Sequence, residues 1–128
     1  MAIQSHTPVR IGTAGIKNQV GAWGVLIPTV DATSVWAMFH IFFVDVLPAA
    51  LVMGLVNIEL GIGPTGQEVR AYKSLLGSAG GSELEFDDSG WTKYLPFTFK
   101  KGVQISCRIA GINQSFGHNL DIQLQLYS

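Results

Sequence analysis

Charged residues are scarce in this chain of 128 residues. Only 13% of them are Asp, Glu, Lys or Arg, about half of the ~25% that is usual in soluble domains. The formal net charge is −1, and the eight basic residues are scattered along the sequence. Proteins that bind nucleic acid normally concentrate basic residues in one patch, so no nucleic-acid partner is expected. An exterior with so few charges suits a protein that buries part of its surface against copies of itself or against another protein.

Cysteine is also nearly absent. The single residue, Cys107, excludes a disulfide within the chain. It lies among apolar residues that alternate with polar ones, where we expect a small buried side chain. The N-terminus has neither a basic region nor an apolar run of the kind that forms a signal peptide. We therefore expect the chain to fold in a reducing cytosol.

Long hydrophobic runs are missing as well. The apolar region 35–63 is divided by Asp45, Pro48, Asn57 and Glu59. The longest uncharged run near its centre, Val46 to Val56, has 11 residues, whereas a membrane-spanning helix needs about 20 predominantly apolar residues. Two buried strands joined by a turn explain this region better than a membrane helix, and no membrane partner is expected.

Alternation of apolar and polar residues is the strongest pattern that the chain does contain. Residues 103–109 and 120–127 alternate almost without error, which is typical of strands with one buried and one exposed side. Residues 35–44 are apolar on both faces, with His40 as the only polar member. Such a strand is central in a sandwich or is covered by another chain. Further strands are expected in 20–28, 49–62, 67–76 and 91–99, although 67–76 is also compatible with a short helix.

These patterns predict an all-β fold of about eight strands. Strands that begin every 10–20 residues are typical of a single antiparallel β-sandwich or jelly roll. Residues 1–19 are expected to form an N-terminal arm or an irregular first strand, and residues 20–128 the sandwich domain. No repeat or linker divides the chain further.

The glycines predict turns. The segment Gly61-Ile62-Gly63-Pro64-Thr65-Gly66 superficially resembles a phosphate-binding loop, but it ends in Gly-Gln-Glu and lacks the Gly-Lys-Ser/Thr of a P-loop. We interpret it as a turn, because glycine adopts positive φ at no steric cost. A second turn is expected at Lys101-Gly102. The structural turn residues are thus Gly61, Gly63, Gly66 and Gly102.

Nothing in the sequence predicts an enzyme. His6, His40 and His118 lie far apart and lack the short spacing of metal ligands. The acidic segment 83–88 lacks the calcium-binding pattern of the EF-hand and is interpreted as a solvated loop. No Gly-x-Ser-x-Gly motif occurs, and a buried Cys107 would be a poor nucleophile. No catalytic residue, cofactor or metal is therefore expected.

Aromatic residues are expected to fill the core and to anchor an interface where they face outward. Strand 35–44 is the richest source of outward aromatics, and His40 within it is expected to be a hydrogen-bonded buried or interfacial residue. The candidate interface residues are Trp36, Phe39, His40, Phe42 and Phe43.

Two segments resemble small virion proteins of tailed bacteriophages. Val56 to Glu68 (VNIELGIGPTGQE) is similar to their apolar strand followed by a Gly-Ile-Gly turn. Leu95 to Arg108 (LPFTFKKGVQISCR) is similar to a second segment of these proteins, in which Leu-Pro and an apolar strand are followed by a basic residue or Ala, then Gly, and a strand that ends in Arg. The resemblance implies a β-sandwich or jelly-roll fold and a part in the phage particle, without catalytic residues. It also implies that Gly61, Gly63 and Gly66 form turns, that Gly102 lies at a hairpin, and that Arg108 faces outward.

The resemblance implies a bacteriophage virion structural protein, above all a capsid decoration (cement) protein. Its expected partners are copies of itself, with a homotrimer favoured, and the major capsid protein or another virion protein. Its expected location is the virion, assembled in the host cytoplasm. The alternative is a tail-fibre or receptor-binding module that recognises host glycans through Trp91, Asp87 and Asp88. A cellular sugar-binding or enzyme-accessory sandwich is a third possibility.

Overall fold

The computed structural model describes residues 2–12, 14, 19–43, 55–76, 91–112 and 119–128. Within these residues the protein is all-β, with nine strands and no helix, and its strands form two antiparallel sheets packed against each other. No helix in this part of the chain is long and apolar enough to cross a membrane. The predicted β-sandwich is confirmed.

The strands follow the predicted apolar segments closely. Segment 67–76, for which a strand and a short helix were both open, is a strand. In chain order the strands are β1 (Ile3–Ser5), β2 (Val9–Gly12), β3 (Gly24–Ile27), β4 (Trp36–Phe43), β5 (Leu55–Ile62), β6 (Val69–Leu76), β7 (Trp91–Leu95), β8 (Ile105–Ile112) and β9 (Asn119–Tyr127).

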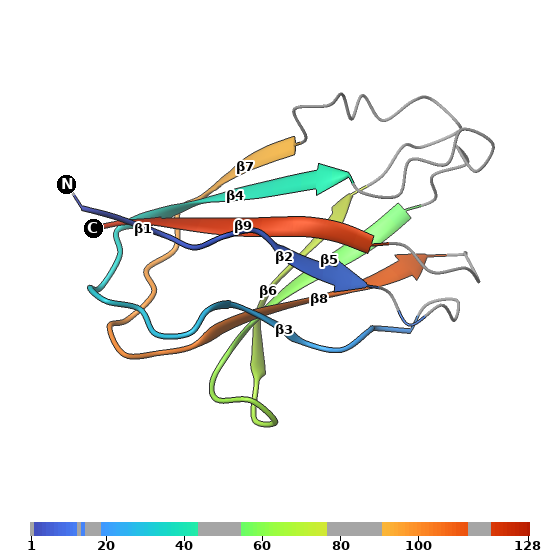
Figure 1. Cartoon of the computed structure of the whole chain (residues 1–128), viewed down its shortest axis with the longest axis horizontal. Coiled ribbons are helices and arrows are strands. Elements are labelled where there is room, and N and C mark those ends of the chain that lie inside the picture. The colour runs from blue at the N-terminus through green and yellow to red at the C-terminus, as the bar shows by residue number, and fades with distance from the viewer. Residues whose placement is uncertain (1, 13, 15–18, 44–54, 77–90, 113–118) are drawn as a thin grey trace.

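The strand order is that of a jelly roll. In sheet A, β9 pairs with β4 on one side and with both β1 and β2 on the other, and β7 pairs with β4. Sheet B has the order β3-β8-β5-β6. Strand β2 therefore pairs with β9, β3 with β8, β4 with β7, and β5 with β6. This is the pattern that results when one long antiparallel hairpin is rolled into two facing sheets (Figure 1).

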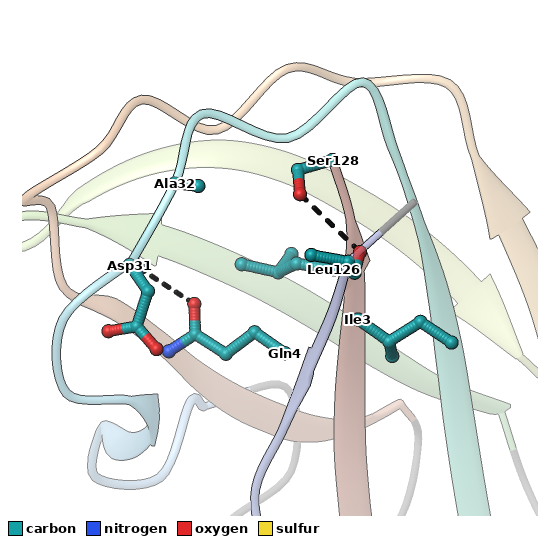
Figure 2. Close-up of a pocket in the computed structure, with 7 residues that line it drawn as sticks. Ile3, Gln4, Asp31, Ala32, Leu126 and Ser128 are labelled. Carbon is teal, nitrogen blue, oxygen red and sulfur yellow. Dashed lines mark hydrogen bonds between the residues drawn. The ribbon is translucent and has the colours of Figure 1, made fainter.

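Residues 3–12, which were expected as an arm or an irregular first strand, form the two short strands along β9. Gln4 fastens this edge to the connection between β3 and β4. Its amide Nε2 donates to the carbonyl oxygen of Thr29 over 2.8 Å, and its Oε1 accepts from the backbone N–H of Asp31 over 2.8 Å. Figure 2 shows Gln4 reaching toward Asp31 while Ile3 points away from it. The hydroxyl of Ser128 also bonds the carbonyl oxygen of Ala2, so the two ends of the chain lie side by side.

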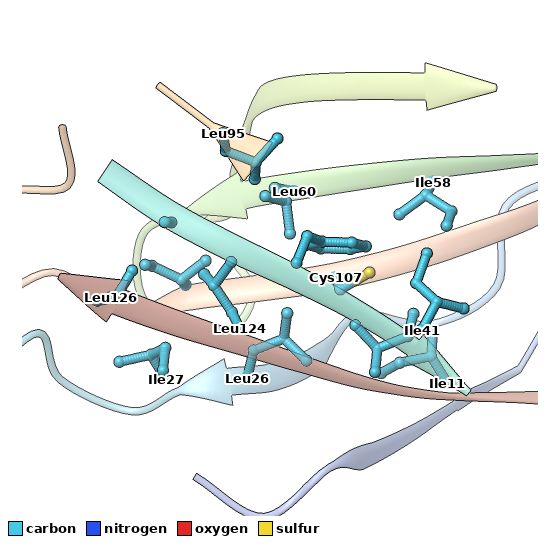
Figure 3. Close-up of a cluster of buried hydrophobic side chains, with 14 of the residues drawn as sticks. Ile11, Leu26, Ile27, Ile41, Ile58, Leu60, Leu95, Cys107, Leu124 and Leu126 are labelled. Atoms are coloured by element: carbon cyan, nitrogen blue, oxygen red, sulfur yellow. The ribbon is translucent and has the colours of Figure 1, made fainter. Parts of the chain in front are cut away.

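The core lies between the two sheets, as Figure 3 shows. In β9 the alternation places every second side chain in this core, because successive residues of a strand face opposite sides. Removing one such side chain, as in Leu→Ala, typically costs about 2–5 kcal/mol. The largest fully buried side chains are Ile11, Ile27, Ile41, Ile58, Leu60, Leu95, Ile105, Ile109, Ile122, Leu124, Val30 and Cys107.

Three of the four predicted turn glycines adopt positive φ. Gly63 and Gly66, with φ of 129° and 88°, form the turn between β5 and β6, and Gly102 has a φ of 91°. The prediction of a hairpin at Gly102 is wrong, however, because β7 belongs to sheet A and β8 to sheet B. Gly102 instead turns the connection between the sheets, where its N–H donates to the carbonyl oxygen of Val30 over 2.8 Å.

The prediction for Gly61 is also wrong. Gly61 is a buried residue within β5, at a bulge that shifts the pairing with β6. A Cβ atom at this position would lie 2.7 Å from Cη2 and 2.9 Å from Cζ3 of Trp23. Gly61 is therefore required by the close approach of an indole ring over the outside of sheet B, and it forms no turn.

Candidate interaction face on sheet A

Strand β4 divides its side chains between the core and the exterior. Ala37, Phe39 and Ile41 are buried, whereas Trp36, Met38 and His40 are half-buried. The outward side chains lie on the face of sheet A that points away from sheet B. On this face β4 has β9 on one side and β7 on the other.

This division determines which of the predicted interface residues face outward. Trp36 and His40 lie on the outer face. Phe39 does not: only 2% of it is exposed, and it packs in the core, so its assignment to an interface is wrong. Phe42 and Phe43 belong to β4, but their side chains lie outside what the structure describes.

Three aromatic rings from three strands form a row on this face. The ring of Trp36 stacks on that of Tyr127 with centroids 3.8 Å apart and planes 1° apart. On its other side lies the ring of Tyr94, 5.3 Å away and tilted by 48°. Ile3 pairs with Tyr127 in the sheet register and extends the row to β1.

His40 links the polar side chains of this face by hydrogen bonds. Its Nε2 lies 3.0 Å from Oε1 of Gln125, and its Nδ1 lies 3.1 Å from Oγ1 of Thr92. The hydroxyl of Tyr127 also donates to Oε1 of Gln125 over 3.0 Å. His40 therefore bridges β9 and β7, and the predicted hydrogen bonding of this residue is confirmed. These bonds hold the outward side chains in fixed positions.

Charged side chains are confined to one end of this face. Among the described outward residues of sheet A, Asp, Glu, Lys and Arg are represented only by Arg10 and Asp121, which lie opposite each other on β2 and β9. Their side chains are 61% and 31% exposed, with Nε of Arg10 3.3 Å from Oδ1 of Asp121. We call the remaining set the aromatic face. It consists of Ile3, Ser5, Trp36, Met38, His40, Thr92, Tyr94, Gln123, Gln125 and Tyr127.

The outer face of sheet B is built differently. Glu59 on β5 pairs with Arg108 on β8 across the sheet, with Nη2 2.9 Å from Oε1, and Arg70 lies 3.8 Å from its other oxygen. The Glu59 side chain is only 6% exposed. The guanidinium of Arg108 lies 4.2 Å from the ring centre of Trp23, a favourable cation–π arrangement. Arg108 thus faces outward, as the resemblance implies, but it serves a buried ion pair.

Sequence reasoning missed this cluster. The alternation around Glu59 indicates that its side chain leaves the core, and an outward carboxylate is normally solvated. The indole that covers this side of the sheet comes from Trp23, which is remote in the sequence. The one local sign of close packing there was the glycine at position 61, which was interpreted as a turn residue instead.

The described residues contain no group of three or more His, Cys, Asp or Glu side chains that could hold a metal ion. His6 lies beside Gln4 after β1, His40 lies on the aromatic face, and His118 is outside the described residues. Burial raises the pKa of the Cys107 thiol far above its usual value, and the negative charge of Glu59 raises it further. A thiol held in this neutral form is a poor nucleophile.

The pockets differ in size and lining. Beside Gln4 lies a pocket of about 90 Å³ (Figure 2), well below the ~300 Å³ at which ligand sites begin. One of about 330 Å³ lies between β6 and the segment after β7, lined by Tyr72, Phe97 and apolar neighbours. The Tyr72 hydroxyl is buried without a hydrogen-bond partner among the described residues. Tyr72 is the sole titratable residue lining this pocket, which gives it no acid–base pair.

The glycan site expected for a tail-fibre module cannot be placed on the fold. Asp87, Asp88 and the side chain of Trp91 lie outside the described residues. No family model, no curated protein and no solved structure matches this chain. The resemblance to phage virion proteins therefore stays a prediction, and any functional proposal depends on the aromatic face.

Proposed function

We propose that this chain is a bacteriophage virion structural protein of the decoration type. It associates with copies of itself and binds the capsid lattice of the major capsid protein, without a catalytic step. The resemblance implies a homotrimer and a location in the virion, reached by assembly in the host cytoplasm. The single observation that carries the proposal is the aromatic face, an uncharged and rigid surface on a sandwich with a dense core.

Surfaces of this composition suit contact between proteins. Aromatic residues and Met are enriched at the cores of protein interfaces, and charged residues are depleted there. A standard interface buries about 1,600 Å². When such contacts repeat over a lattice, each bound copy restrains its neighbours, so modest single affinities combine into strong overall binding. The expected result is a capsid shell that resists internal pressure.

The rival function, glycan recognition by a tail-fibre module, has less support. Sugars stack on exposed ring faces, but one face of the Trp36 ring is covered by Tyr127, and the tilted ring of Tyr94 lies 5.3 Å from it. Tyr94, which is 54% exposed, is the one ring of the row with a broad open surface. A single open ring gives a sugar chain little area to bind.

Mass spectrometry of purified particles tests the proposal. A decoration protein is expected in many copies per particle, in a fixed ratio to the major capsid protein. A handful of copies per particle would indicate the tail-fibre function instead. Absence from the particle, together with no binding of the purified protein to empty capsids, would overturn the virion role altogether.

A further inference from the structure

We propose that the aromatic face of sheet A is covered by the aromatic face of a second copy of this chain. The inference deepens the proposed function, on which it rests for the need to assemble, and it names both the surface and the partner. A face-to-face contact closes on two copies. The structure thus points to a dimer as the assembling unit, in place of the homotrimer that the resemblance implies.

Apolar side chains are exposed at both edges of the row of rings. Ile3 is 59% exposed and Tyr94 is 54% exposed. Large apolar side chains exposed on one face normally mark an interaction site. Tyr and Trp are also the residues that most often dominate binding energy.

The aromatic face is complementary to itself. It contains no Asp, Glu, Lys or Arg, so two copies meet there without repulsion between like charges. Its polar members are amides and hydroxyls, such as Gln123, Gln125 and Thr92, and each of these groups can both donate and accept a hydrogen bond. A strongly charged partner would find no opposite charge here, whereas a second copy finds matching chemistry.

The register of sheet A also favours a second copy. Tyr127 on β9 lies directly opposite Trp36 on β4. A two-fold axis along the strands, between β9 and β4, therefore places Tyr127 of one copy over Trp36 of the other, so that four aromatic rings meet around the axis. In the next outward row, where Ser5, Gln125, Met38 and Tyr94 lie side by side, the same axis places Ser5 over Tyr94 and Gln125 over Met38.

The available area sets the strength of the pair. The aromatic face spans residues 36–40 of β4 and four strand positions, which at a spacing of about 4.8 Å and a rise of about 3.4 Å per residue give a face of roughly 330 Å². Two such faces bury about 650 Å², a size typical of weak, transient contacts. The pair is thus expected to be reversible in solution and to be reinforced on a lattice.

Sedimentation equilibrium of three proteins tests the inference. The wild type is expected to reach the mass of a dimer at concentrations up to about 100 µM, a range that detects even weak pairs. Tyr94→Arg inserts a charge into each copy's face and is expected to raise the dissociation constant at least ~10-fold. Val69→Arg is the matched control, because Val69 is 69% exposed on β6 of sheet B, away from the face. It should leave the mass unchanged.

Every outcome bears on the inference. A dimer that only Tyr94→Arg dissociates supports it. A monomer, a trimer, a dimer that Tyr94→Arg leaves intact, or a dimer that Val69→Arg dissociates equally well overturns it. Thermal melting of the two variants checks that both are folded, and if Tyr94→Arg fails to fold, the milder Tyr94→Gln replaces it. A trimer found in purified particles would overturn the inference but not the virion role. A dimer in solution that is absent from particles would support the inference and overturn the virion role.

Discussion

The two outer faces of the sandwich differ in how their side chains are satisfied. On sheet B, Glu59 is paired with Arg108, whose guanidinium lies against the ring of Trp23. On sheet A, the ring of Trp36 has Tyr127 and Tyr94 as neighbours, but Tyr94 and Ile3 remain open to solvent. The outer face of sheet B thus holds a buried ion pair that stabilises the fold, whereas the described residues leave the apolar edges of the aromatic face uncovered.

This difference separates stability from binding. Substitutions on sheet B should lower the free energy of unfolding, because they break contacts made inside one copy. Substitutions at the exposed edge of the aromatic face should leave that free energy nearly unchanged and affect association only.

Arg108→Ala is expected to be the most damaging of these changes. It leaves the Glu59 carboxylate, whose side chain is 6% exposed, with only the more distant Arg70. Removing one partner of a buried ion pair typically costs roughly 3 kcal/mol. Urea denaturation followed by circular dichroism measures the loss in unfolding free energy.

Arg10→Ala is the matched control, since it breaks the exposed pair with Asp121 on sheet A. Exposed ion pairs contribute about 0–1 kcal/mol, so this variant should remain close to the wild type. Equal losses for the two arginine variants would contradict the comparison between the faces.

Gly61→Ala is expected to cost about 1–2 kcal/mol, because the new methyl group overlaps the indole of Trp23. The cause is tested by a double-mutant cycle with Trp23→Ala. In that background the overlap is gone, and Gly61→Ala should be neutral or slightly stabilising, as is usual when a glycine in a strand is replaced. Thermal unfolding of the wild type, the two single variants and the double variant gives the coupling free energy between positions 61 and 23. Additive effects would show that Trp23 does not restrict position 61.

The unfolding free energy is expected to fall above pH ~9 because of Cys107. Burial raises the pKa of this thiol in the folded state, whereas the unfolded thiol titrates near pH 8.5–9. The unfolded state therefore loses its proton first, and the contribution to stability, complete below that pH, is lost at up to ~1.4 kcal/mol per pH unit as the pH rises. Denaturation at pH 8 and pH 10 of the wild type and Cys107→Ala measures it. A drop of the same size in both proteins would contradict the assignment.

Tyr94→Arg should change the unfolding free energy of the single copy by less than ~0.5 kcal/mol, as is usual for exposed positions. Thermal melting at a concentration low enough to keep the protein monomeric measures this effect. A loss above ~2 kcal/mol would mean that Tyr94 supports the fold of its own chain, and the distinction between the faces would fail at this residue.

The sequence predicted the fold because the fold depends on local alternation. Leu120, Ile122, Leu124 and Leu126 face one side of β9 in any β-sandwich, and positive φ at Gly63 and Gly66 follows from the turn chemistry of glycine and proline. These features require no knowledge of distant partners. The strands of the alternating segments and the turn at Gly102 could therefore be predicted, whereas several strand ends differ: β7 ends at Leu95 although a strand was expected over 91–99.

Features that depend on contacts between distant segments could not be predicted. Strand β4 is apolar on both sides, so its alternation does not reveal that Phe39 faces the core and Trp36 the exterior. The buried ion pair of Glu59 could not be predicted from its own segment, because its partner Arg108 and the Trp23 ring that packs on Arg108 both lie on distant segments. Gly61 resembles a turn glycine in the sequence, because the pattern of residues does not show the indole that packs above it.

Hydroxyl-radical footprinting of the assembled and the dissociated protein tests the central claim most directly. Assembly should protect Tyr94, Met38 and Ile3 on sheet A from oxidation, while Val69 on sheet B reacts to the same extent in both states. Equal reactivity of Tyr94 before and after assembly, or protection that falls on Val69 instead, would contradict the claim that the aromatic face is the surface through which this protein assembles.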